Sequence, residues 1–282
     1  MGYNNIGDFM VRTDLIDEIK AEQNDEILGV EAFDKTIENV KISTVKIKND
    51  YAQNFIGKPK GNYYTISFPR LDYVCNTQNI INSTVETLKN IYDKDIESAL
   101  VVGLGNLDIT PDALGPLTCS RILATRHLNN ELKRNLGLDN LKSVCCLNPD
   151  VLGKTGIESY DTVYAIANKI KPDVIIAIDA LACRDAERLC RTIQISDTGI
   201  IAGSGVNNAR KALNHSALGI PVIAVGIPTV IDANSFFNTQ ETIMVTPKEI
   251  DLLVEKSTDI LSRAINIFLQ PDIDIDVIES LT

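Results

Sequence analysis

The sequence predicts an α/β fold of three layers, in which helices cover both faces of a mostly parallel sheet after a strand-rich N-terminal extension. From about residue 99 onward, short apolar runs alternate with segments of helical periodicity, as in a sheet with helical crossovers. The run at 172–179 is apolar almost throughout, which is typical of a strand buried on both faces. Residues 28–72 hold β-branched and aromatic runs bounded by glycines, which indicates the additional strands.

The individual elements follow from the same patterns. An acidic helical pattern runs from residue 11 to about residue 23, and residues 76–92 carry an apolar stripe at helical spacing. Strands are expected at 99–102, 143–147, 172–179, 192–196 and 221–226, and helices at 113–127, 157–170 and 246–268. Thr246 and Glu249 have the spacing of a capping box, with Pro247 suited to the first helical position.

The domain organisation is expected to be simple. Residues 1–10 are small and polar, which is typical of a mobile tail. No repeat or low-complexity linker divides the rest, so residues 15–282 are expected to form a single α/β domain. The alternative is a sub-boundary near residue 95, where the strand-rich part gives way to the alternating part.

Composition and charge exclude several classes of partner. The net charge of −11 argues against nucleic acid, because phosphate binding needs a basic surface. The N-terminus lacks the basic and apolar regions of a signal peptide, and no apolar run approaches the length of a membrane span. We therefore expect a cytoplasmic protein with no membrane partner.

The cysteines and histidines do not predict a metal site or a cofactor. The chain has six cysteines, none in a CxxC pair, and two histidines. In a cytosolic chain such cysteines are most simply small buried apolar residues. A cysteine nucleophile with a histidine base stays open, although no local signature supports it.

The stretch 99–116 carries the first candidate site. An apolar strand ends at Gly103 and Gly105, where the chain turns, and Asn106 continues the loop. Thr110 is suited to cap the helix that follows, which places Asp112 in its first turn at the carboxyl end of a strand. Ligands bind at that edge of an open α/β sheet. The alternative is that Asp112 only complements the helix dipole.

Asp179 repeats this arrangement after the apolar run at 172–179. Two carboxylates at one sheet edge can share a proton and activate a water against an amide bond. N–H donors at the helix start are expected to favour the anion at Asp112, and burial to disfavour it at Asp179, so that the two pKa values move apart. The alternative is that Asp179 pairs with Arg184 or Arg188.

Two glycine-containing loops surround the carboxylates. The loop 148–156 includes Lys154 and Thr155 but lacks the spacing of a P-loop, and the loop 200–211 includes Gly203 and Ser204 but lacks the third glycine of a dinucleotide fingerprint. Ser204 also lacks the G-x-S-x-G context of a serine hydrolase. Both loops are suited to hold a peptide backbone or simply to turn the chain.

Several of these segments together resemble the germination protease of spore-forming bacteria. The resemblance extends in order along nearly the whole chain, at 11–15 (VRTDL), 101–106 (VVGLGN), 110–116 (TPDALGP), 125–128, 154–158, 171–174, 177–182 (AIDALA), 192–200, 203–206, 228–230 and 244–249 (MVTPKE). It implies a phosphorylase/hydrolase-like fold and an endopeptidase of the spore core that degrades small acid-soluble spore proteins without a cofactor. It also implies an aspartic-type pair, which maps onto Asp112 and Asp179.

The resemblance further implies a zymogen and a homotetramer. Residues 1–14 correspond to a propeptide, and self-cleavage is expected near Asp14 and Leu15. The apolar residues expected to contribute to an interface are Ile227, Val230, Ile231, Phe236 and Phe237, for which the pattern offers no partner.

Two other functions remain as alternatives. The strand–loop at 101–106 and the later strand-ending aspartate also resemble hydrogenase maturation proteases, which use nickel, although no matching histidine is present. The other alternative is a binding scaffold in which the two aspartates only cap and pair.

Overall fold

A computed structural model describes residues 13–21, 27–71, 76–135, 138–201, 211–233 and 243–282. Its centre is one nine-stranded sheet with the order β1-β2-β3-β7-β8-β6-β4-β5, in which β9 pairs with β8. The strands are β1 Val30–Ile37, β2 Val40–Ile47, β3 Gly61–Ser67, β4 Ser98–Gly103, β5 Ser143–Leu147, β6 Val174–Cys183, β7 Thr192–Ser196, β8 Val222–Asp232 and β9 Met244–Val245.

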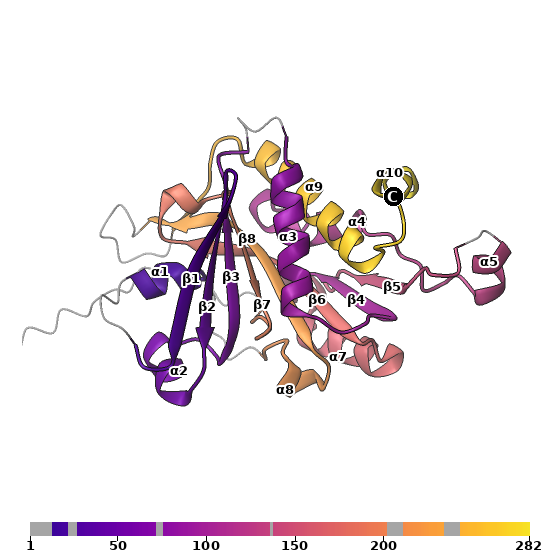
Figure 1. The fold of residues 1–282 in the computed structure, drawn as a ribbon, viewed down its shortest axis with the longest axis horizontal. Coiled ribbons are helices and arrows are strands. Elements are labelled where there is room, and N and C mark those ends of the chain that lie inside the picture. Colours follow the sequence, from indigo (N-terminus) through magenta and orange to yellow (C-terminus); the bar gives the residue numbers. More distant parts are fainter. Residues whose placement is uncertain (1–12, 22–26, 72–75, 136–137, 202–210, 234–242) are drawn as a thin grey trace, which may run out of the picture.

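The predicted fold class is confirmed, with the parallel strands gathered in the core of the sheet. Strands β8, β6, β4 and β5 pair in parallel, whereas β1, β2, β3 and β7 extend the same sheet in antiparallel register. The strand-rich N-terminal part is therefore continuous with the α/β core (Figure 1). It meets the core through β7, a strand that comes more than 120 residues later in the chain.

The helices lie on both faces of this sheet. They are α1 Ile16–Ala21, α2 Asp50–Ile56, α3 Gln78–Ile91, α4 Leu114–Ser120, α5 Asn130–Asn135, α6 Leu152–Thr155, α7 Ser159–Ile170, α8 His215–Leu218, α9 Ile250–Leu269 and α10 Ile275–Leu281. Short 3-10 turns occur at Thr110–Asp112 and Ala186–Arg188. None of the described helices is both long and apolar enough to span a bilayer.

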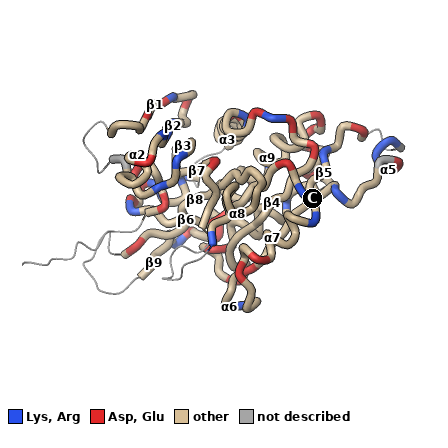
Figure 2. The backbone as a smooth tube through the Cα atoms, turned by 90° about the horizontal axis from the view of Figure 1, so that it is seen from below, with Lys and Arg blue, Asp and Glu red and all other residues tan. Residues whose placement is uncertain are grey.

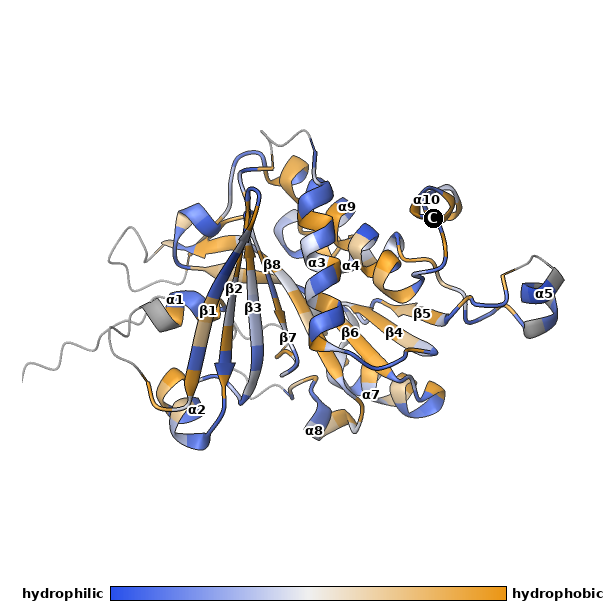
Figure 3. Cartoon of the chain, viewed as in Figure 1, coloured by the Kyte–Doolittle hydropathy of each residue, from blue (hydrophilic) through white to orange (hydrophobic). Residues whose placement is uncertain are grey.

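One face of the sheet is sealed by α3, α4 and α9. Ile176 and Ile178 of β6 and Val225 of β8 pack there with side chains such as Leu88 of α3 and Ile265 of α9. Figure 1 shows α3 lying across this face, and Figure 3 shows that β4, β6 and β8 are largely apolar. This cluster is the main core of the molecule.

The opposite face is covered in two separate places. Ile175 and Ala177 of β6 pack with Val163 of α7 at one side. At the other side, Ile56 of α2 packs with Tyr63 of β3, and α1 joins the same cluster. Residues of β6, β7 and β8 line a pocket on this same face between the two clusters, because the side chains alternate along each strand.

The charged surface contributes little to this architecture. Acidic and basic positions are interspersed along the described backbone (Figure 2). Typical ion pairs, such as Lys35 with Glu86 at 2.9 Å and Lys41 with Asp34 at 2.7 Å, join side chains that are about half exposed. Such pairs contribute about 0–1 kcal/mol each, so that apolar burial dominates the stability of the fold.

The helix expected at 113–127 is shorter, and the structure shows why. A 3-10 turn precedes α4, which ends at Ser120. Beyond it, the backbone N–H groups of Thr125 and Arg126 both donate to Val144 O of β5 at 2.9 Å, which a continued helix would prevent. The side chain of Asn266 on α9 bonds the backbone of Arg121, so α9 also fixes the end of α4.

Two expected helix caps are also wrong. The Thr246 hydroxyl donates to Thr229 O at 2.8 Å instead of capping a helix. Helix α9 begins at Ile250 after Glu249, with no side-chain cap. Thr110 does not cap its turn either, since Ile109 occupies the position before it. In each case another part of the fold determines where the helix begins.

The apolar residues expected to form an exposed interface lie largely in the core. Ile227 and Ile231 belong to β8 and are buried against neighbouring strands, and Val230 is half-buried. Phe236 and Phe237 lie outside the described residues, as do residues 1–10. The error arose because β8 continues to Asp232, six residues beyond the expected end of this strand at 226.

A close backbone contact joins α4 to the carboxyl end of β4 and to the middle of β6. A Cβ atom at Gly115 would lie 2.3 Å from Leu104 O and 2.6 Å from Ile178 O. Leu104 N donates to Ile178 O at 2.8 Å in the same place. Only glycine allows the helix to approach the backbone of these two strands so closely.

We predict that Gly115→Ala lowers the melting temperature by roughly 3–10 °C, since overpacking costs about 1–3 kcal/mol and each kcal/mol is worth about 2–4 °C in a chain of this size. Gly153→Ala is the matched control, because no heavy atom lies within 4 Å of the added Cβ in α6. Calorimetry of both variants measures the difference. Equal melting temperatures would contradict the proposed packing constraint.

Candidate functional site

A pocket of about 540 Å³ lies on the second face of the sheet. Its floor comes from β6, β7 and β8, including the small residues Ala224 and Gly226. Its walls come from the end of α2 on one side and from the starts of α6 and α7 on the other. Asp112 and Asp179, the two carboxylates singled out in the sequence, both line it.

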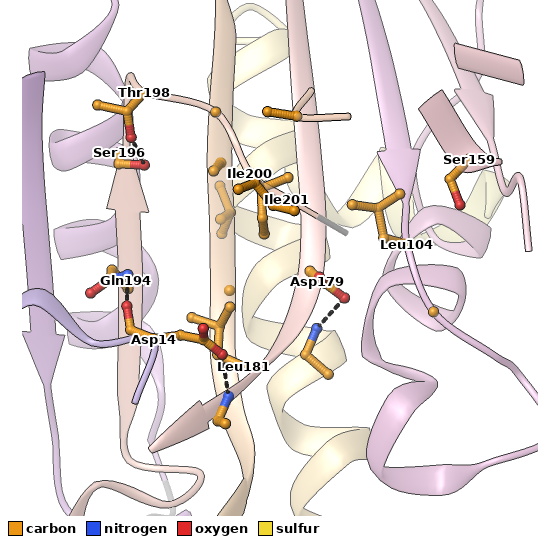
Figure 4. A pocket seen from close by; sticks show the side chains of 18 of the residues that line it. Asp14, Leu104, Ser159, Asp179, Leu181, Gln194, Ser196, Thr198, Ile200 and Ile201 are labelled. Carbon is orange, nitrogen blue, oxygen red and sulfur yellow. Dashed lines mark hydrogen bonds between the residues drawn. The ribbon is translucent and has the colours of Figure 1, made fainter. Parts of the chain in front are cut away.

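Asp179 points into the pocket from within β6. Ile176 and Ile178 face the main core, so the alternation along the strand directs Asp179 to the other face. The side chain is 8% exposed, and its Oδ1 accepts from Ala180 N at 2.9 Å (Figure 4). Asp179 does not end its strand as expected, because β6 continues to Cys183 after a bulge at Leu181.

Asp112 is presented by the 3-10 turn at 110–112. Its Oδ2 accepts from Asn106 N at 2.8 Å, so that the carboxylate holds the loop that leaves β4. Gly105 is required here: its φ is +116°, and a Cβ would lie 2.0 Å from Asp112 O. Burial raises the pKa of Asp112; the bond from Asn106 opposes this shift, and the charge of Asp150 adds to it.

The upward shift of the Asp112 pKa is opposite to the shift expected from the sequence. N–H donors are expected to stabilise the anion of Asp112, but in the structure its carboxyl accepts a backbone hydrogen bond from Asn106 N and is partly buried. Desolvation therefore outweighs the hydrogen bond. The pKa of Asp112 is therefore shifted upward, opposite to the expected direction.

The other expected site residues support the pocket from outside. Lys154 Nζ bonds Asp108 at 2.8 Å, Asp150 at 2.9 Å and Asn106 Oδ1 at 3.3 Å, and so joins the loop after β4 to the loop after β5. The residues expected to hold substrate that do not line the pocket are Gly103, Asn106, Thr110, Lys154 and Thr155. Gly203 and Ser204 lie outside the described residues.

The N-terminal segment enters the same pocket, which Asp14 lines. Asp14 N donates to Ala182 O at 2.9 Å, and the Asp14 carboxylate accepts from Ala182 N at 2.8 Å. The carbonyl of Asp14 accepts from Lys58 Nζ at 3.2 Å and from Gln194 Nε2 at 3.0 Å. Figure 4 shows Asp14 bonded towards both β6 and β7.

Residues 15–18 anchor this segment to the fold. Leu15 is fully buried with Leu181, Cys183 and Ile231. The carboxylate of Glu18 accepts from the backbone N–H groups of residues 184 and 185, at 2.9 and 3.0 Å. Arg188 forms an ion pair with Asp17. The segment is thus held by both apolar and charge-assisted contacts.

Sequence reasoning missed Lys58, Gln194 and the main chain of Ala182. They lie 44, 180 and 168 positions from Asp14 along the chain. No local pattern marks them, because sheet pairing brings Ala182 and Gln194 to the pocket, and Lys58 comes from the loop between α2 and β3.

The cysteine and metal alternatives find little support in the described residues. Burial raises the pKa of the Cys183 thiol, which disfavours the thiolate. His127 and His215 are exposed and do not line the pocket. Across the described ranges, no group of three or more His, Cys, Asp or Glu is arranged to hold a metal ion. Among the residues that the structure describes, Asp112 and Asp179 therefore have no third such donor grouped with them.

The described geometry defines the class of protein as an α/β enzyme with a carboxylate-bearing, peptide-holding pocket, as in a peptide hydrolase. The germination protease family profile, peptidase family A25, matches residues 10–243. The chain belongs to the germination protease family and is therefore a peptidase with a role in spores.

Individual relatives agree with this assignment. The chain is 38% identical to the germination protease of Clostridium tetani (strain Massachusetts / E88), over 96% of this chain and 98% of that protein. It is 43% identical to the germination protease of Priestia megaterium (strain ATCC 12872 / QMB1551), over 84% of this chain and 67% of that protein. A solved [NiFe] hydrogenase maturation protease, HycI from Thermococcus kodakarensis KOD1, is 16% identical with a TM-score of 0.40, over 65% of this chain and 99% of that one.

We predict that Asp112→Asn raises the melting temperature at neutral pH. A raised carboxyl pKa means that the folded protein loses stability as pH rises from the ordinary carboxyl pKa of about 4 through the raised value. Asparagine keeps the acceptor for Asn106 N without the buried charge. The gain should disappear at acidic pH, where Asp112 is protonated in both folded and unfolded chains.

Thermal melts of both proteins across this pH range measure the effect. Asp139→Asn is the charge-matched control, because Asp139 is exposed in the turn before β5. A gain for Asp112→Asn that is independent of pH would contradict the assignment to burial of the carboxylate.

Proposed function

We propose that this peptidase is an endopeptidase that initiates the degradation of small acid-soluble spore proteins, in the spore core, during germination. The observation that supports this most strongly is that Asp112 and Asp179 line one pocket together with the peptide segment at Asp14. The spore substrate comes from membership of the family. We expect no cofactor in the reaction.

The proposed mechanism uses the two carboxyl groups as acid and base. Asp179, in ionised form, takes a proton from a water as its oxygen attacks the carbonyl carbon of the scissile bond. Asp112 acts from its protonated form, towards which burial shifts its pKa, and donates to the leaving amide nitrogen. The tetrahedral oxyanion needs hydrogen-bond donors, and the carbonyl of Asp14 already accepts from Lys58 and Gln194.

We further propose that the chain is a self-processing zymogen with residues 1–14 as its propeptide. Asp14 is in the pocket, and Leu15 is buried beside it, so the bond between them lies next to the candidate machinery. A homotetramer is the proposed assembly. Strand β1 supports an interface, since six of its eight residues are exposed at the edge of the sheet and Phe33 is 54% exposed.

We predict that Asp112→Asn and Asp179→Asn each lower cleavage of a small acid-soluble spore protein by roughly 10³-fold or more, because each removes one half of the acid–base pair. The double variant should be barely slower than either single variant, since the pair acts as one unit. Turnover and melting temperature are measured on the same samples.

Asp139→Asn again serves as the control and should cleave at the wild-type rate. Retained turnover per folded molecule in Asp179→Asn would contradict the aspartic pair. A wild-type enzyme that cleaves only with added nickel would favour the hydrogenase-maturation type of chemistry instead.

We predict that the full chain, incubated at mildly acidic to neutral pH, loses residues 1–14 and becomes more active. Intact mass and the new N-terminus, expected at Leu15, are the measurements. Asp179→Asn should stay uncut over the same period. Equal trimming of wild-type and Asp179→Asn protein would point to a contaminating protease and contradict self-processing.

A further inference from the structure

Gln194 makes two main-chain contacts on either side of the Asp14–Leu15 bond. Its Nε2 donates to Asp14 O at 3.0 Å, and its Oε1 accepts from Ile16 N at 2.7 Å. One side-chain amide therefore spans the peptide bond expected to be cut. We propose that Gln194 is the main-chain clamp that positions the scissile bond; this inference rests on the proposed self-processing.

The contacts are of a kind that suits an endopeptidase. They involve only the backbone carbonyl of residue 14 and the backbone N–H of residue 16, where α1 begins, so they hold the main chain of this segment without regard to its side chains. From the opposite side, Asp14 N donates to Ala182 O at 2.9 Å. Residue 14 is thus held from β7 and from β6, two strands separated in the sheet by β8.

The strand between them leaves room for the peptide. Ala224 and Gly226 of β8 line the pocket floor, and neither has a side chain larger than a methyl group. A Cβ at Gly226 would lie 2.6 Å from the Leu181 side chain and 2.9 Å from Asp179 O. The small side chains of β8 therefore leave space above the sheet for a peptide main chain, as a peptide-binding groove requires.

The register of β7 fixes the clamp in this groove. Ile193 and Ile195 are buried on the sealed face, so Gln194 between them faces the pocket. Gln194 pairs with Gly226 on β8 and with Thr65 on β3, both in antiparallel register. A slip of one residue would put an isoleucine in the pocket and the amide in the core, so the position is strongly specified.

Lys58 gives the clamp a second donor. Its Nζ lies 3.2 Å from Asp14 O, so the carbonyl that Gln194 holds receives donors from two different elements. Donors fixed on a carbonyl before attack also stabilise the oxyanion that attack creates. Gln194 therefore positions the bond and shares in polarising it.

The test compares self-cleavage of the full chain carrying Gln194→Met or Gln194→Glu with wild type. Methionine fills the space but keeps neither bond, and self-cleavage should slow by roughly 10–100-fold, given about 0.5–1.5 kcal/mol for each hydrogen bond. Gln194→Glu is isosteric, and its protonated carboxyl group can donate and accept as the amide does. Its rate relative to wild type should recover to within about threefold as pH falls through its pKa.

If Gln194 had a purely structural role, the self-cleavage rate of Gln194→Glu would not recover as pH falls. The charged groups that line the pocket are present in all three chains, so their titration is common to the rates being compared; they are Asp14, Lys58, Asp112, Glu158, Asp179 and Lys211. Gln78→Met on the exposed start of α3 is the control for loss of an amide and should cut as wild type.

The outcomes separate the clamp from the function on which it rests. If wild type loses residues 1–14 and Gln194→Met does so at an equal rate, the clamp is overturned and self-processing stands. If Gln194→Met and Gln194→Glu are equally slow at every pH, the hydrogen-bonding role is also overturned. A wild-type chain that never cuts itself overturns both proposals.

Discussion

The close contact at Gly115 is the constraint on which the rest of the site depends. It brings the first turn of α4 against Leu104 O, just after β4, and Ile178 O, in the middle of β6. Asp112 precedes this contact by three residues, and Asp179 follows Ile178 directly. Two aspartates on different elements can therefore line one pocket only because the helix start meets both strands without a side chain between them.

One face of the sheet supplies most of the apolar packing, and the other face carries the pocket. One face is sealed by α3, α4 and α9 over a large apolar cluster, which supplies most of the buried area. The other is covered in two separate places, and the pocket lies between them. A rigid sheet with one sealed side holds polar groups on its open side at fixed distances, which is what acid–base chemistry at a peptide bond requires.

Local patterns in the sequence predicted the parts of the fold that local interactions decide. The strand at 143–147 has its predicted bounds, and Asp112 and Asp179, which the sequence pattern singles out, both line the pocket. The cap at Thr246 was wrong because its hydroxyl bonds the distant Thr229 O. The cap at Thr110 was wrong because Thr110 lies inside its 3-10 turn, after Ile109. Gln194 could not be recognised at all: its partners are 178 and 180 positions away, and only the pairing of β7 with β8 and β3 brings them together.

The docking of Asp14 has a consequence for the order in which the molecule is built. The segment emerges first during synthesis, yet its contacts are with Ala182 and Gln194, which are made more than 160 residues later. It has no place to bind until β6, β8 and β7 have paired, because these strands form its floor. Contacts of such high sequence separation close late in folding. Residue 14 can therefore occupy the pocket only after β6, β7 and β8 have paired.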